Sequence, residues 1–217
     1  GVVTSTDRTR FSNAGAIFST TPSWVRNYNA DNQVWAPDVS FHGGKYLMYY
    51  TASKFATNTS AIGFASSSTG KPGSWKDQGI VYTSKSSDDY NAIDGNLVVD
   101  GGGKWWLAFG SFWSGIKLIQ LDPGTGKQLS SNTARYSLAS RPYPGAVEAP
   151  FIQQANGWYY LFVSFDACCK GASTTYKIAV GRARSVTGPY LDRAGVDMRN
   201  GGGTVIQSGL GLSLIHI

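Results

Sequence analysis

The chain has 217 residues, which is enough for one large domain with a hydrophobic core. Charged residues make up only 15% of it, while there are 27 glycines and 13% aromatic residues, a composition that excludes disorder and favours many strands and tight turns. The net charge of +6 comes from scattered Lys and Arg residues without a basic cluster, so the sequence predicts no nucleic-acid binding and at most weak attraction to acidic polysaccharide.

The N-terminal part of the chain gives weak structural signals. Residues 1–13 are polar, residues 14–19 are predicted as a short strand, and residues 22–32 as a loop that contains Trp24. Gly1 opens directly into the polar stretch, so we expect a mature or truncated product without a signal peptide. No apolar run reaches the roughly 20 residues that a membrane span needs.

A repeated unit begins at residue 35. Residues 35–53, WAPDVSFHGGKYLMYYTAS, contain an acid near the start, an apolar run, a turn that ends in glycine and an aromatic strand. Residues 60–66 alternate as a half-buried strand, and residues 75–83 are predicted as an outer strand.

The unit recurs twice and then starts again. Residues 91–115, NAIDGNLVVDGGGKWWLAFGSFWSG, form the second copy, whose predicted outer strands are residues 116–121 and a strand near 136–138. Residues 147–164, VEAPFIQQANGWYYLFVS, form the third, with an outer strand over 176–183. A fourth is expected to begin near residues 201–207.

The three acids are Asp38, Asp94 and Glu148, separated by 56 and 54 residues. A strand repeat of about 50 residues indicates an all-β propeller, here an incomplete one of about three to four blades. We expect residues 1–208 to form this single domain. Residues 209–217 are an apolar tail that is either foreign sequence or a genuine strand.

The spacing to the turn glycine separates the acids. Asp94 and Glu148 each lie 9 residues before it, at Gly103 and Gly157, whereas Asp38 lies 6 before Gly44. We therefore expect Asp94 and Glu148 to occupy equivalent places and to converge on one pocket. The matching place in the first unit is Trp35, which should form part of the wall. Asp38 is interpreted as a turn residue.

The sequence identifies no metal site. Its two histidines, His42 and His216, are far apart, and adjacent Cys168 and Cys169 lack the spacing of a four-ligand zinc site. The cysteines form either a vicinal disulfide or two thiols. We expect no required cofactor, and an axial calcium ion stays open because its ligands are not identifiable.

Six segments resemble glycoside hydrolase family 43, specifically its endo-1,5-α-L-arabinanases. They are WAPDV (35–39), AIDGNL (92–97), GSFWSGIKLIQLD (110–122), VEAPFI (147–152), YYLFVSFDACC (159–169) and GPY (188–190). The resemblance implies a five-bladed propeller and an extracellular enzyme that hydrolyses α-1,5-linked arabinan with inversion.

The resemblance also implies catalytic roles. Glu148 in VEAP would be the general acid, and Asp94 in IDG, where the family usually has IDP, would orient Glu148 and modulate its pKa. An inverting mechanism further needs a general base. The family supplies it from a His-Asp-Pro motif that this sequence lacks, so we expect the base to be missing from the chain. Asp7 has the wrong context for that role and Asp38 the wrong register.

Aromatic residues at the strand mouths are candidates for contact with sugar. Trp35, Phe112 and Trp113 would stack on sugar rings, Ser111 would hydrogen-bond to sugar, and Phe165 would shape the rim. Trp105, Trp106, Tyr159 and Tyr160 lie inside strands, where core packing is the expected role.

Two alternatives remain from the sequence alone. One is a related arabinofuranosidase or xylosidase of the same fold, and the other is a catalytically inactive carbohydrate-binding propeller. In each case the expected partner is a polysaccharide and the chain is expected to be monomeric.

Overall fold

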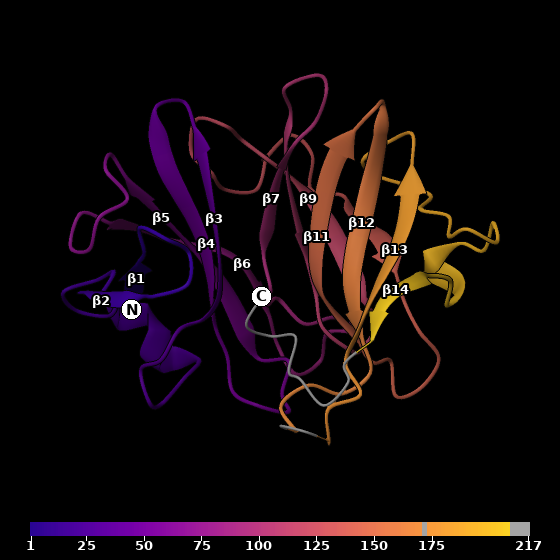
Figure 1. Ribbon diagram of the computed structural model, residues 1–217, viewed down its shortest axis with the longest axis horizontal. Helices are drawn as coiled ribbons and strands as arrows, with labels where there is room; N and C mark the ends of the chain where they lie inside the picture. The colour runs from indigo at the N-terminus through magenta and orange to yellow at the C-terminus, as the bar shows by residue number, and fades with distance from the viewer. Residues whose placement is uncertain (171–172, 209–217) are drawn as a thin grey trace.

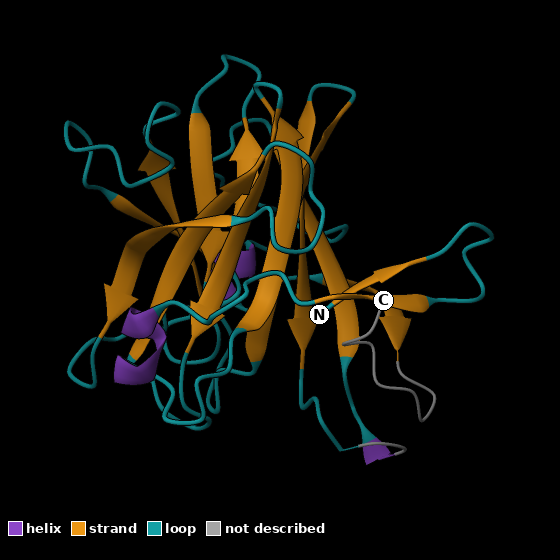
Figure 2. Ribbon diagram, turned by 90° about the vertical axis from the view of Figure 1, so that its left-hand side faces the viewer, coloured by secondary structure: helices purple, strands orange, loops and turns teal. Residues whose placement is uncertain are grey.

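The computed structural model describes residues 1–170 and 173–208, and these residues form an all-β molecule. Figures 1 and 2 show sheets standing side by side, with short helical turns at the edges. Four antiparallel sheets are present among the described residues: one of two strands and three of four strands. The predicted tail, residues 209–217, lies outside the described residues. No described helix is both long and apolar enough to cross a bilayer.

The N-terminal segment differs from the prediction. Strand β1 (Val2–Thr4) pairs with β2 (Ser12–Gly15), so the polar residues contain a small hairpin and the predicted strand begins earlier than expected. A 3-10 helix, η1 (Ser23–Asn27), occupies the predicted loop. The side chain of Trp24 packs on Gly63, where an added Cβ would lie 2.4 Å from the indole.

Each predicted unit forms one four-stranded sheet. The first contains β3 (Trp35–His42), β4 (Lys45–Ala52), β5 (Ser60–Ser67) and β6 (Lys76–Ser84). The second contains β7 (Asn96–Val99), β8 (Trp105–Phe109), β9 (Ile116–Leu121) and β10 (Arg135–Ala139). The third contains β11 (Val147–Ala155), β12 (Trp158–Phe165), β13 (Lys177–Ala183) and β14 (Thr204–Ser208). Strands follow chain order within each sheet, as expected for propeller blades.

Strand β14 corrects one prediction. Residues 201–207 were expected to begin a fourth unit. Instead β14 pairs with β13 and completes the third sheet as its outermost strand. Strand β14 therefore pairs with the open edge of β13 and does not begin the innermost strand of a new sheet.

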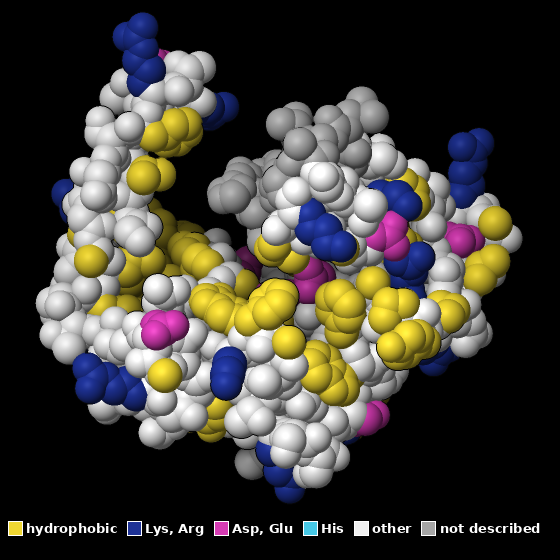
Figure 3. Space-filling view, turned by 90° about the horizontal axis from the view of Figure 1, so that it is seen from below, with side chains coloured by type: hydrophobic (Ala, Val, Ile, Leu, Met, Phe, Trp, Pro, Cys, Tyr) yellow, Lys and Arg dark blue, Asp and Glu magenta, His cyan; other side chains and the backbone are white. Residues whose placement is uncertain are grey.

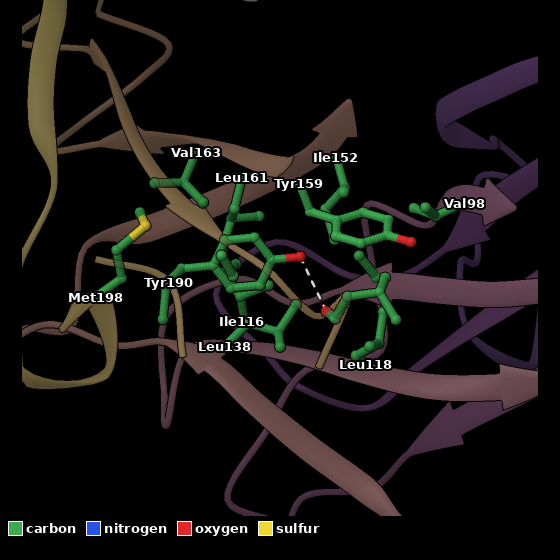
Figure 4. Packing of buried hydrophobic residues seen from close by; sticks show 14 of the residues in the cluster. Val98, Ile116, Leu118, Leu138, Ile152, Tyr159, Leu161, Val163, Tyr190 and Met198 are labelled. Atoms are coloured by element: carbon green, nitrogen blue, oxygen red, sulfur yellow. Dashed lines mark hydrogen bonds between the residues drawn. The ribbon is translucent and has the colours of Figure 1, made fainter. Parts of the chain in front are cut away.

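Hydrophobic side chains pack between neighbouring sheets. Strand β4 alternates, so Leu47 and Tyr49 join a cluster with the second sheet, while Met48 and Tyr50 face the N-terminal segment. A further cluster joins the second and third sheets, and Figure 4 shows Tyr159 and Leu161 of β12 packed near side chains of the second sheet. Trp106 and Tyr159 are buried in this cluster, as predicted.

A recurring hydrogen bond sets the register between sheets. Asp38 Oδ2 accepts from the backbone N–H of Leu97 at 3.0 Å, and Asn96 Oδ1 accepts from that of Ile152 at 2.9 Å. Asp38 is therefore a strand residue that joins the first two sheets, not the turn residue that was predicted. Burial raises the pKa of Asp38, against the lowering effect of hydrogen bonds from Leu97 and Asn96.

Candidate active site

A hollow of about 1670 Å³ lies where the innermost strands β3, β7 and β11 meet. The hollow is lined by residues that include Trp35, Asp38, Asp94, Ser111, Phe112, Trp113, Glu148 and Tyr176. Seen from below in Figure 3, the surface is hollowed and hydrophobic side chains gather along it. This volume exceeds the roughly 300–1,000 Å³ of ordinary small-molecule pockets, so the hollow has room for part of a polymer.

A β-bulge places Glu148 at the hollow. Glu148 pairs with Ser164, and the next pair is Phe151 with Phe162, so Ala149 and Pro150 form an irregularity in the ladder. Trp35 pairs with Thr51 and is followed by the same irregularity before Asp38. Such bulges re-aim side chains at sheet ends. Trp35 is thus the counterpart of Glu148, and both line the hollow as expected.

Asp94 occupies a different position from the one predicted. Ala36, Asp94 and Ala149 all have left-handed backbones, with φ of 42°, 59° and 53°. Each lies two residues before Asp38, Asn96 or Phe151, which the inter-sheet hydrogen bonds make equivalent. Asp94 therefore corresponds to Ala149 and not to Glu148. Counting from the turn glycine was wrong by one residue because the turn before Gly103 is one residue longer than the others.

The two carboxyl groups nevertheless converge. Asp94 Oδ2 accepts a hydrogen bond from the backbone N–H of Ala149 at 3.1 Å, which places it beside Glu148. Burial, followed by the negative charge of Glu148, raises the pKa of Asp94 to about 7, while the hydrogen bond from Ala149 acts in the opposite direction. Near neutral pH the site can therefore hold a proton between two adjacent carboxyl groups.

Both oxygens of Glu148 have hydroxyl partners. Ser111 Oγ lies 2.8 Å from Oε2, and the phenol of Tyr176 hydrogen-bonds to Oε1. Ser111 was predicted to hydrogen-bond to sugar, and the structure places it in the lining of the hollow with its hydroxyl on the Glu148 carboxyl group. Tyr176 was not predicted, because it precedes β13 without a recognisable motif.

The aromatic candidates divide into two groups. Phe112 and Trp113 line the hollow, and Trp113 is 41% exposed. Phe165 does not line it: its side chain is 5% exposed, belongs to the core and lies beneath the Arg141 guanidinium. The structure thus contradicts the prediction that Phe165 shapes the rim of the pocket as a substrate-binding residue.

Sequence reasoning also missed Phe55 and Tyr143, which are 77% and 100% exposed at the edge of the hollow. Both lie in loops between strands, where exposure could not be predicted from the sequence pattern.

Cys168 and Cys169 form a disulfide bond and line the hollow, which settles the open question of their state. Among residues 1–170 and 173–208, no group of three or more His, Cys, Asp or Glu side chains could hold a metal ion. Among these described residues no ligand set for an axial calcium ion is identifiable.

Paired carboxyl groups in a hollow with aromatic walls are the arrangement that a glycoside hydrolase requires. Comparison with known families agrees, since the model of glycosyl hydrolases family 43 matches residues 1–203. The chain belongs to this family.

Known relatives match almost the whole chain. The extracellular endo-α-(1→5)-L-arabinanase 1 of Bacillus subtilis is 52% identical over 96% of the chain, and the extracellular exo-α-(1→5)-L-arabinofuranosidase ArbA of Cellvibrio japonicus is 38% identical over 96%. The chain spans 64% and 65% of these two relatives. The solved endo-arabinanase from Bacillus licheniformis superposes with a TM-score of 0.90 at 52% identity, covering 95% of this chain and 71% of that one.

Proposed function

We propose that this chain is part of an extracellular enzyme that hydrolyses α-1,5-linked L-arabinan with inversion, and that the complete fold is a five-bladed propeller acting as a monomer. The carboxyl pair of Asp94 and Glu148 is the observation that carries the proposal. The 52% identity to an extracellular endo-arabinanase supports the substrate and the location.

In the proposed mechanism Glu148 is the general acid and donates its proton to the oxygen of the scissile glycosidic bond. Asp94 orients this acid from the neighbouring sheet through its contact with Ala149. Trp35, Phe112 and Trp113 would pack against the apolar faces of the sugar rings. No cofactor is required for these steps.

Inversion also requires a base that activates water from the opposite face of the sugar, about 6.5–9.5 Å from the acid. Asp38 is the third carboxyl group at the hollow, but its oxygens accept hydrogen bonds from Asn96 and Leu97. Asp38 is therefore committed to the contact between sheets. We accordingly propose that the base is supplied by a residue that is not among these 217.

The experiment is release of reducing ends from linear 1,5-α-L-arabinan by the chain extended to include the segment that supplies the base, with Glu148→Gln in the same extended protein as the matched control. We expect Glu148→Gln to abolish turnover and to leave arabinan binding largely intact, because the amide keeps the shape of the carboxyl group. A large loss of binding instead would assign Glu148 a structural role.

Two alternatives have distinct signatures. A related exo-acting furanosidase, which the Cellvibrio relative exemplifies, would release single arabinose units and not a range of oligosaccharides. A carbohydrate-binding propeller without catalysis would bind arabinan but release no reducing ends, even after the chain is extended to include a His-Asp-Pro segment.

A further inference from the structure

We infer that Tyr176 is a positioning residue that fixes Oε1 of Glu148 as a hydrogen-bond acceptor, so that Oε2, next to Ser111, is the oxygen that carries the catalytic proton. This inference rests on the proposed role of Glu148 as general acid. It adds a residue that the sequence did not reveal and assigns different tasks to the two carboxyl oxygens.

The carboxyl group of Glu148 is held from both sides. The Tyr176 phenol bonds Oε1, and Ser111 Oγ lies 2.8 Å from Oε2. Both partners are buried, with exposed fractions of 3% for Tyr176 and 4% for Ser111. A β-bridge between Ser111 and Glu148 also joins their backbones. The orientation of the carboxyl group is therefore set by two different strand ends.

The two hydroxyl partners are not interchangeable. Burial and the charge of Glu148 raise the pKa of Tyr176, so its phenol stays protonated and remains a donor throughout the working pH range. The Ser164 hydroxyl acts on this phenol in the opposite sense. Ser111, by contrast, can rotate its proton and serve as donor or acceptor. Only the Oε2 side can therefore adapt when Glu148 gains or loses its proton.

Contacts around the Tyr176 backbone hold this phenol in place. Lys177, the next residue, forms an ion pair with Asp166 at 2.6 Å, and Asp166 also pairs with Arg141 at 2.6 Å. Thr174 Oγ1 donates to the carbonyl of Ala167 at 3.0 Å. These contacts close the base of the loop that carries Cys168 and Cys169, and Tyr176 stands at its end.

The charged and titratable groups around the Glu148 carboxyl come from several elements. Asp94 approaches it from the second sheet and Tyr176 from the third, and the same hollow is also lined by Asp38, Lys54, Arg141 and Lys170. Tyr176→Phe removes the phenol hydroxyl and replaces none of these charged side chains. A change in titration after this removal can therefore be attributed to the lost donor.

The sequence permits a direct test, because Glu148 is the only glutamate among the 217 residues. Protein prepared with glutamate labelled with ¹³C at the side-chain carboxyl gives one titrating carboxyl resonance. In Tyr176→Phe we expect the pH midpoint of this resonance to rise by about one unit, because the ionised form loses a charge-assisted hydrogen bond. An unchanged midpoint in the folded variant would overturn the inference.

Two further variants keep the test informative. Tyr190→Phe removes another buried phenol donor, to the carbonyl of Val186, and should leave the midpoint unchanged. Ser111→Ala should move it by less than about half a unit, because a rotatable hydroxyl favours neither protonation state strongly. If Ser111→Ala shifts the pH midpoint by as much as is expected for Tyr176→Phe, the assignment of the proton to Oε2 is contradicted. This comparison can still be made if Tyr176→Phe fails to fold.

Activity provides a second readout. In the active protein we expect Tyr176→Phe to lower kcat about tenfold with little change in KM, because the phenol is engaged with Oε1 of Glu148 and acts through that carboxyl group. A raised KM with unchanged kcat contradicts the positioning role. The carboxyl resonance can be measured without turnover. Failure of the protein extended to include the base to cleave arabinan counts against the proposed function, and the comparison of midpoints remains readable.

Discussion

Asp38 and Leu97 join the first sheet to the second through a side chain-to-backbone hydrogen bond of 3.0 Å. Asn96 makes the equivalent bond to Ile152 of the third sheet. Either an Asp or an Asn can therefore fill this position, because what the interface needs is an oxygen that accepts from a backbone N–H.

Replacing Asp38 by Ala leaves the N–H of Leu97 without this acceptor. We expect Asp38→Ala to lower the free energy of unfolding by about 1–3 kcal/mol. Asp38→Asn should cost less, since Asn96 shows that the amide works in this setting. Urea denaturation of the three proteins measures the order, and equal losses in both variants would mean that charge and not the hydrogen bond matters.

Asp94 should make stability fall as pH rises. The pKa of Asp94 is raised from 3.8 to about 7 in the folded protein, so the folded state binds a proton more tightly than the unfolded state. The stabilisation is complete below about pH 4 and is lost as pH increases through about 7. We expect Asp94→Asn to flatten this slope in melting temperatures measured from pH 4 to 8. A slope equal to that of wild type would show that Asp94 titrates normally.

Gly115 supports the segment that presents Ser111 and Trp113. Its φ is +81°, and an added Cβ would lie 2.1 Å from the carbonyl oxygen of Ala139. Gly115→Ala should therefore cost about 3 kcal/mol or more in stability, because clash and backbone strain add. Gly43 also has a positive φ, of +58°, but no atom within 4 Å of an added Cβ. Gly43→Ala should cost about 1 kcal/mol in thermal or urea unfolding, and similar losses at both sites would contradict the clash.

Replacing Trp113 or Trp106 is expected to affect different properties: Trp113 sugar binding, and Trp106 the stability of the fold. Trp113 is 41% exposed at the hollow, whereas Trp106 is 6% exposed in the core. We expect Trp113→Ala to weaken arabino-oligosaccharide binding about tenfold with little loss of stability. Trp106→Ala should instead cost about 3–5 kcal/mol of stability. Calorimetric titration measures oligosaccharide binding by each variant, and urea unfolding measures its stability. Unaltered binding by Trp113→Ala would show that Trp113 is not part of the binding site.

Much of the fold could be predicted because hydrophobic alternation and glycine turns are local signals. The three hairpins that begin at Trp35, Asn96 and Val147 were recognisable from their own sequences. The role of β14 could not be predicted, because an apolar segment can begin a sheet or complete one, and only the vacant edge of β13 decides which.

The convergence of the two carboxyl groups was predictable for a similar reason, since Asp94 and Glu148 each lie just before or at the start of the innermost strand of a repeated unit. Their relative register was not, because one extra residue in a distant turn shifted the count. Partners outside the repeat were invisible as well. Tyr176 reaches Glu148 across 28 residues of sequence, a contact that only the folded sheet creates.

The left-handed position shared by Ala36, Asp94 and Ala149 has a consequence for how such sites diversify. The backbone path two residues before Asp38, Asn96 and Phe151 imposes this conformation on whichever residue is present, and Asp tolerates it better than Ala. Each four-stranded sheet thus has one left-handed position just before or at the start of its innermost strand, and in the second sheet this position carries the carboxyl group of Asp94. New chemistry in this scaffold can therefore arise from a single exchange at Ala36 or Ala149, without any change in the path of the backbone.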